Sequence, residues 1–394
     1  MRRIIDKILK WVTSLYLVWR REFRLVFTDA GVLIFFFLLP TLYPLIYTLI
    51  YNPEIVRDIP VAVVDNCRTT ASREFTRMTD ATEAIKIIGY ASNLNEARQW
   101  HAQKACYGIL VIPEDYEKNI GRGEQSHVIF YSDMGLLIRY RELLSAMTDL
   151  SLATGTKIRQ ELYNTDSQPI NSTSIILGDT KQGFASFVIP GILILIIQQS
   201  LILGIAMLGG GANERRMRNR GIDPLAVKAT ATATIIGKAL CYFTIYIPLV
   251  IYILYFVPVF FNLPNIGNVV DYLLFIVPLI FSSIFFGMIF QRAVSERESS
   301  MLIVVFSSVV FLFLSGLTWP RYAMGKLWIW IGNCIPATWG VEGFIRINSN
   351  GASLEQNTHP YIMLWILTCC YFLIILFIEL LIKFKPKKYH PLRR

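Results

Sequence analysis

The chain has 394 residues, of which 54% are hydrophobic and only 17% charged, with a formal net charge of +10 and a mean hydropathy of +0.47. This charged fraction excludes an ordinary soluble domain, in which about a quarter of the residues are charged. The Lys and Arg residues flank apolar segments, where they act as topology signals and contact anionic lipid head groups, so we expect no nucleic-acid partner.

Residues 1–29 mix apolar and basic side chains at near-helical spacing, with Ile8, Trp11, Leu15 and Trp19 among the apolar ones. This pattern is typical of an amphipathic helix that lies on a membrane surface. A signal peptide would carry a small-residue cleavage site after its apolar segment, and none follows here. We therefore predict an N-terminal amphipathic surface helix.

Apolar blocks nearly free of charge then recur along the chain, each close to the ~20 residues that cross a bilayer as a helix. We predict transmembrane spans at 30–51, 184–208, 229–257, 272–290, 301–318 and 361–382. Pro258, Asn262 and Pro264 separate the third span from the fourth. The apolar segment at 319–360 is interrupted by Pro336, and we expect re-entrant or interfacial pieces there and no full span.

Residues 52–183, between the first two spans, have the composition of a soluble domain. Strand-like runs at 60–65, 84–89, 105–113 and 126–132 alternate with helical candidates, and a long amphipathic stretch covers 136–163. This alternation predicts a small α/β domain. The expected fold class is thus a membrane all-α protein of about six transmembrane helices with an inserted extracytoplasmic α/β domain.

The distribution of Lys and Arg predicts the orientation of the spans. Basic residues gather in the N-terminal segment, in the loop at 209–228, between the fourth and fifth spans, and in the tail at 383–394. With an even number of spans these segments share one side, which the positive-inside rule makes cytoplasmic. We expect a multi-pass protein with both termini in the cytoplasm.

Few residues are candidates for metal binding, disulfide formation or nucleotide binding. The four His residues form no HExxH or HxH pattern and the Cys residues no CxxC pair, so we expect no metal site. Cys67 and Cys106 would share the oxidising side, and both a disulfide and two unpaired thiols remain open. A GxxxxGK[ST] loop is absent from the sequence, so a site of that kind for ATP is not expected in this chain.

Polar side chains also occur within the predicted spans, where they are costly and often functional. Gln198 and Gln199 lie near the middle of the second span. They would either line a substrate path or bind a neighbouring helix through hydrogen bonds. Lys238 lies close enough to the cytoplasmic end of the third span for its ammonium group to reach the interface.

Five segments together resemble one family of membrane proteins. They lie at 56–65 (VRDIPVAVVD), 105–116 (ACYGILVIPEDY), 214–238, 315–324 (SGLTWP with Met324) and 335–352. In this order they resemble the permease subunits of bacterial ABC exporters with one large external loop after the first span, the type V arrangement. In the third segment Gly221 is displaced, and Ile222 stands where the family has Thr.

The resemblance implies a site on each side of the membrane. On the cytoplasmic side, a short helix near 213–225 would transmit the motion of an ATPase through Glu214, Arg215, Arg216, Gly221, Pro224 and Leu225. An external gate would be formed by Ser315, Gly316, Pro320, Pro336, Trp339, Glu342 and Arg346. The chain itself would carry no cofactor, because a separate ABC ATPase subunit would bind ATP and Mg.

The resemblance also implies partners and a function. A second permease chain, identical or a paralogue, would complete the path through the inner membrane, and a periplasmic adaptor and an outer-membrane channel are further expected partners. The substrate would be amphiphilic or lipophilic: a drug, a lipid or an envelope component, moved out of the cytoplasm or inner membrane. The alternative is a non-transporting scaffold or sensor that uses the external domain for recognition.

Overall fold

The computed structural model describes residues 2–51, 56–163 and 183–384. These residues form two compact units: unit 1 comprises Met1–Asn52 with Ile176–Arg394, and unit 2 comprises Pro53–Ile175. Most of the predicted basic tail at 383–394 lies outside the described residues, as do both ends of the predicted domain at 52–183.

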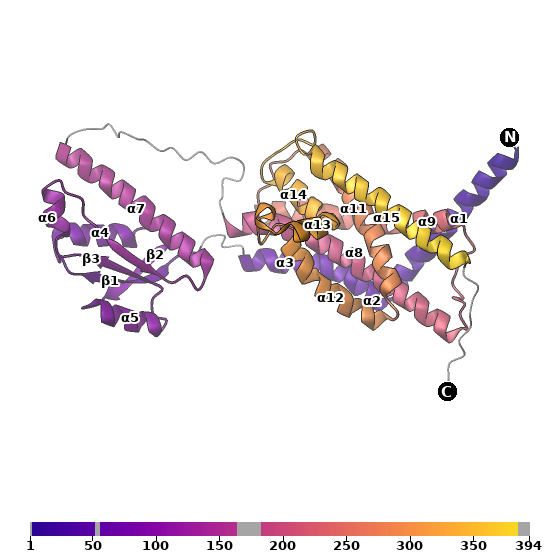
Figure 1. Ribbon diagram of the computed structural model, residues 1–394, viewed down its shortest axis with the longest axis horizontal. Helices are drawn as coiled ribbons and strands as arrows, with labels where there is room; N and C mark the ends of the chain where they lie inside the picture. Colours follow the sequence, from indigo (N-terminus) through magenta and orange to yellow (C-terminus); the bar gives the residue numbers. More distant parts are fainter. Residues whose placement is uncertain (1, 52–55, 164–182, 385–394) are drawn as a thin grey trace. The chain divides into compact units, whose positions relative to one another are not determined.

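Among the described residues of unit 1, six helices are long and apolar enough to cross a membrane (Figure 1). They are Ala30–Tyr51 (α2, Ala30–Leu33; η1, Ile34–Leu38; α3, Leu39–Tyr51), α8 (Phe184–Arg218), Ala231–Phe260 (α9, Ala231–Ile251; η2, Tyr252–Phe256; α10, Val257–Phe260), α11 (Val269–Ala293), α12 (Arg297–Leu314) and α15 (Thr358–Phe384). The helix α1 (Arg2–Thr28) precedes them, and η3 (Arg321–Ala323), α13 (Lys326–Asn333) and α14 (Pro336–Asn348) lie between α12 and α15. This helical, apolar architecture agrees with the predicted class of membrane all-α protein.

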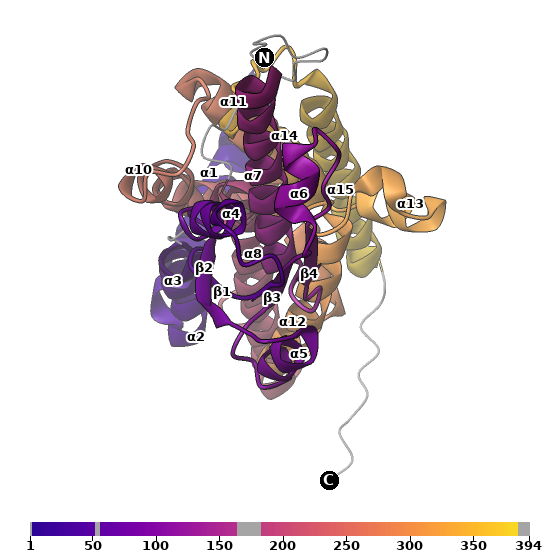
Figure 2. The ribbon, with the colours of Figure 1, turned by 90° about the vertical axis from the view of Figure 1, so that its left-hand side faces the viewer.

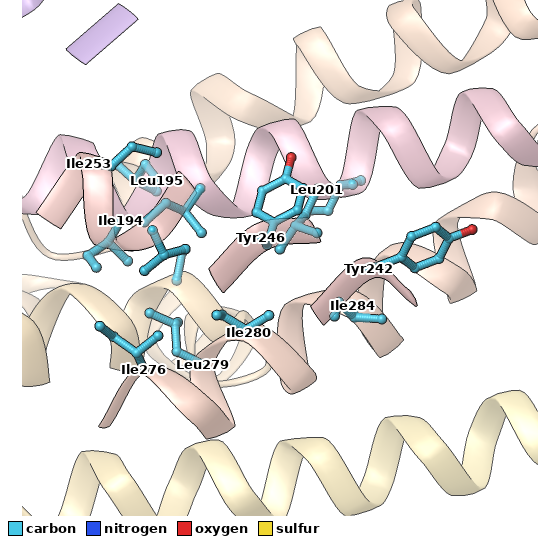
Figure 3. Packing of buried hydrophobic residues seen from close by; sticks show 14 of the residues in the cluster. Ile194, Leu195, Leu201, Tyr242, Tyr246, Ile253, Ile276, Leu279, Ile280 and Ile284 are labelled. Atoms are coloured by element: carbon cyan, nitrogen blue, oxygen red, sulfur yellow. The ribbon is translucent and has the colours of Figure 1, made fainter. Parts of the chain in front are cut away.

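The helix α8 is the centre of unit 1, because nearly all of its apolar part is buried and it packs against α3, α11, α12 and α14. Figure 3 shows side chains of α8, α9 and α11 pointing toward one another, among them Ile194, Tyr246 and Ile280. Close approach requires glycine at Gly204, where a Cβ atom would lie 2.1 Å from the ring of Phe36. Such tight packing fixes the helices that carry the sites described below.

Two predicted boundaries differ from the structure. The predicted second span, 184–208, continues as helix to Arg218, so no separate helix forms near 213–225, and turns and extended chain follow up to α9. The glycines at 209–211 do not end α8, and Gln291 of α11 and the start of α12 pack directly on them. The predicted fifth span, 301–318, ends at Leu314, since Gly316 adopts a left-handed conformation with φ of +87°.

The segment predicted as an interrupted gate, 319–360, forms two helices, α13 and α14. Pro336 occupies the first turn of α14, where its missing N–H group is not needed for a helical hydrogen bond. Most of α14 is buried, and it packs against α8, α11 and α15. It is therefore part of the helical core.

Unit 2 is a four-stranded sheet covered by helices on both faces (Figure 2). The strand order is β2 (Ile85–Tyr90), β1 (Ile59–Asp65), β3 (Gly108–Ile112) and β4 (Ile129–Ser132), with β4 antiparallel to β3 and the other pairs parallel. One face is covered by α4 (Thr70–Asp80), α6 (Tyr116–Gly121) and α7 (Leu137–Tyr163), and the other by α5 (Leu94–Ala102). The structure thus contains the strands and helices of the predicted α/β unit.

The two cysteines of unit 2 contact different cores, on opposite faces of the sheet. Val61 and Val63 point into the core under α4 and α7, which Cys67 also contacts. Cys106 belongs to the core on the opposite face, with Ala62. Both thiols are free, so the disulfide alternative is wrong. Burial raises the pKa of the Cys106 thiol.

Candidate functional site

Ion pairs join the segments that the sequence placed on one side of the membrane. Arg297, at the start of α12, lies 2.8 Å from a carboxylate oxygen of Asp29 and 3.4 Å from one of Glu214, near the end of α8. Arg292 of α11 pairs with Glu379 of α15. The end of the N-terminal segment, the end of α8, the segment between α11 and α12 and the last turns of α15 therefore border the same end of unit 1.

The loop between α8 and α9 is held by Asp223, which sequence analysis missed. Its carboxylate is buried and accepts hydrogen bonds from Arg21 of α1 at 2.8 Å and from Arg215 of α8 at 3.0 Å. Burial raises the pKa of Asp223, but the hydrogen bonds from Arg215 and the Leu225 N–H group outweigh it, so that the pKa is lowered. The Asp-Pro dipeptide, a turn signal, was the clue in the sequence.

A second buried carboxylate, Glu22 of α1, faces the span α9. Lys238 lies 3.2 Å from Oε1 of Glu22, and the Tyr242 hydroxyl donates to Oε2 at 3.1 Å. Lys238 therefore makes a partly buried ion pair with α1, a partner that the sequence did not indicate. Gly237 permits this contact, because a Cβ atom there would lie 2.9 Å from the carbonyl oxygen of Leu15.

The six residues predicted to transmit motion divide into two groups. Glu214 and Arg215 turn inward to Arg297 and Asp223, whereas Arg216, Gly221, Pro224 and Leu225 are exposed. Beside them lie two exposed apolar side chains that the prediction missed. They are Met217 and Ile222, which are 59% and 56% exposed, next to Leu225 at 48%. Exposed apolar side chains at a helix end and on a loop fixed to two helices are typical of a protein-binding surface.

The predicted gate residues gather around Arg321, which sequence analysis also missed. Its guanidinium lies 2.6 Å from a carboxylate oxygen of Glu342, binds the side-chain oxygen of Asn333, and covers the ring of Trp339 at 4.5 Å. Arg346 binds the other oxygen of Glu342 at 2.8 Å. These five side chains, the Arg321 cluster, hold α13 and α14 to the turn after α12.

The other predicted gate residues shape that turn. Ser315 is buried, donates to the Leu312 carbonyl at 2.7 Å and accepts from the Leu317 N–H group at 3.3 Å. A Cβ atom at Gly316 would lie 2.8 Å from Cγ of Arg321, so the glycine also leaves room for the cluster. Pro320 precedes the short helix η3, which carries Arg321. The central interaction of the cluster is thus the ion pair between Arg321 and Glu342.

The two glutamines of α8 differ in their surroundings. Gln198 is buried, and its Oε1 accepts the N–H group of Ala337 at 2.6 Å, so it binds the first turn of α14. Gln199 lines an apolar groove of about 380 Å³ between α3, α8 and α12, with Tyr43 and Tyr47. The Nε2 atoms of both glutamines have no partner among the described residues. The structure therefore brings only Gln199 to an open surface.

The six apolar helices among the described residues, with ion pairs that join their ends on one side of unit 1, define a polytopic membrane protein. The chain belongs to the ABC-2 family of transporter proteins, whose family model matches residues 30–377. It is accordingly the membrane subunit of an ABC transporter, a transport subunit without an ATP-binding site, and its family implies an ABC ATPase partner. A comparison with curated proteins gave no match.

Proposed function

We propose that the chain is the permease of an ATP-driven exporter in a bacterial inner membrane, with both termini in the cytoplasm. It would move an amphiphilic or lipophilic substrate out of the cytoplasm or the membrane. The observation that carries the proposal is the exposure of Met217, in the last turn of α8, and of Ile222 and Leu225, on the following loop that Asp223 ties to α1 and α8.

This geometry suits the transmission of motion from an ATPase. A subunit docked on these exposed side chains would push on a loop whose buried carboxylate is bound to Arg21 and Arg215. Because α8 packs against four other helices, a displacement of its end would reach the centre of unit 1. Energetic coupling over such distances is carried by packed helices and ion-pair networks of this kind.

A second permease chain is proposed to cover α8 and α12. The outer face of α12 exposes Val305, Phe306, Val309 and Phe313, and the groove at Gln199 lies beside it. The groove volume falls in the range of about 300–1,000 Å³ that is usual for ligand sites, and its walls are mostly apolar. These features support an amphiphilic substrate and a path between two chains.

The positive-inside rule supports an extracytoplasmic position for unit 2 and for the gate at the Arg321 cluster. An extracytoplasmic unit 2 would be available to a periplasmic adaptor and, through it, to an outer-membrane channel. ATP and Mg would be bound by the ATPase subunit alone.

The test is to purify the tagged chain with its candidate ATPase in mild detergent, count permease chains per complex and measure ATP-driven transport in proteoliposomes. We expect two permeases per complex and loss of ATPase binding in Leu225→Asp. The control is Ile88→Asp, which places the same charge at an exposed apolar position of unit 2 and should leave binding intact. A chain that purifies alone, without ATPase activity, would support the scaffold or sensor.

A further inference from the structure

Unit 2 contains a cavity of about 650 Å³ that its side chains leave unfilled. It lies between α4, α6, α7 and the segment that leads into β4. Its wall is part polar and part apolar, and the apolar part is formed by Phe75, Tyr116, Ile120, Val128 and Ile158. The volume is in the range of sites for drug-sized ligands, roughly 300–1,000 Å³.

Two hydroxyl groups in the cavity wall lack partners. Oγ of Ser126 and Oγ1 of Thr154 are buried, yet neither makes a hydrogen bond to any residue that the structure describes. Thr154 is only 9% exposed. Buried hydroxyls are nearly always hydrogen-bonded, because leaving them unpaired is costly. A ligand with a polar group at this wall would satisfy both.

Gly155, next to Thr154, keeps the cavity open. It lies within α7, where glycine weakens a helix relative to alanine. No packing contact requires it, since a Cβ atom there would meet nothing within 4 Å, and Gly155 itself lines the cavity. Gly155 therefore leaves space in the cavity that a larger side chain at this position would occupy.

The charges at the cavity balance one another. Glu124 contributes one carboxylate and Arg159 one guanidinium, and with His127 neutral the lining has no net charge. Arg159 would attract a bound anion, and Glu124 would repel it. The lining therefore favours an uncharged ligand with an apolar body and a hydroxyl or carbonyl head.

We propose that this cavity is a binding site for an uncharged, drug-sized amphiphile, with its head at Ser126 and Thr154 and its apolar body against Phe75 and Ile158. The inference concerns unit 2 alone, and it holds whichever way the transporter moves its substrate.

The experiment is photolabelling of the full chain in lipid nanodiscs with a long-chain alcohol that carries a diazirine, followed by peptide mass spectrometry. Labelling is expected on the cavity peptides around 116–128 and 151–159, and excess unmodified alcohol should suppress it. Gly155→Leu should reduce this labelling at least tenfold by filling the cavity. Gly121→Leu is the matched control, because a Cβ atom at Gly121 also meets nothing within 4 Å and Gly121 does not line the cavity.

Thr154→Val keeps the shape of the wall and removes one hydroxyl, so it tests the site without filling it. We expect the concentration for half-maximal labelling to rise roughly threefold to tenfold, as for the loss of one neutral hydrogen bond. Wild-type labelling of the cavity peptides in both Gly155→Leu and Thr154→Val would overturn the site. Labelling by a diazirine fatty acid but not by the alcohol would overturn the proposed ligand class.

Discussion

Glu22 of α1 and Lys238 of the membrane-spanning helix α9 form an ion pair, with 3.2 Å between Oε1 and Nζ. The Glu22 side chain is 2% exposed and that of Lys238 18%. The pair therefore lies inside the contact between the N-terminal helix and the bundle, and the first predictions concern this contact.

Breaking the pair from one side should destabilise the protein strongly. Glu22→Gln leaves Lys238 without its counter-charge, and the loss of one partner of a buried pair costs about 3–5 kcal/mol. The double variant Glu22→Gln with Lys238→Met should cost much less than the sum of the two single changes. Thermal unfolding in detergent would measure this, with Lys10→Met on the exposed face of α1 as the control. Additive effects would show that the two side chains are not coupled.

Gly237→Val should displace α1 from α9, because the first added carbon would lie 2.9 Å from the backbone oxygen of Leu15 and the backbone cannot yield as a side chain can. The expected result is faster proteolysis of α1 in membranes, with the spans still inserted. Gly155→Ala adds a methyl group to a helix with open space around it, and it should leave the proteolysis of α1 unchanged. Equal protection of α1 in Gly237→Val and wild type would contradict the close contact.

The contribution of Asp223 to stability should depend on pH. Its folded-state pKa is below the unperturbed 3.8, so in acid the unfolded chain takes up a proton before the folded one. The stabilisation is then complete above about pH 4 and is lost as the pH falls through the folded-state pKa. Unfolding midpoints of wild type and Asp223→Asn should differ near neutral pH and converge in acid. Parallel curves would exclude this role for Asp223.

Replacing Arg321 should destabilise the Arg321 cluster more than replacing Arg346, although both side chains bind Glu342. Arg321→Met removes charged hydrogen bonds to Glu342 and Asn333, each worth roughly 1.5–3 kcal/mol, together with the contact to Trp339. Arg346→Met removes a more exposed pair four residues along one helix, worth below about 1 kcal/mol. Cysteine accessibility at α13 in membranes would report the opening of the cluster. Similar effects of the two variants would contradict this order.

Much of the fold could be predicted from the sequence, because the signals for a membrane span and for a strand are both local. A span needs about 20 apolar residues, and a strand needs alternation or a short apolar run, and these patterns located α8 and β1. Predictions failed where a helix end depends on distant neighbours. The second span was predicted to end at 208, yet α8 continues to Arg218 through the glycines at 209–211, on which Gln291 of α11 and the start of α12 pack.

The candidate sites were predicted in part, for a related reason. Sequence reasoning found Glu342 and Arg346 but missed Arg321, which completes their cluster from a separate segment. It found Arg215 but missed its partner Asp223, since a lone Asp-Pro dipeptide reads as a turn and nothing more.

The sequence by itself determined which segments are apolar enough for a membrane, which side carries the positive charge, and which family the motifs resemble. Only the tertiary structure decided the partners of the charges: Arg21 and Asp223 are 202 positions apart, and Glu22 and Tyr242 are 220 apart. The physical reason is that hydrophobic length is a property of one segment, whereas an ion pair forms only where packing brings two segments together and excludes water from both.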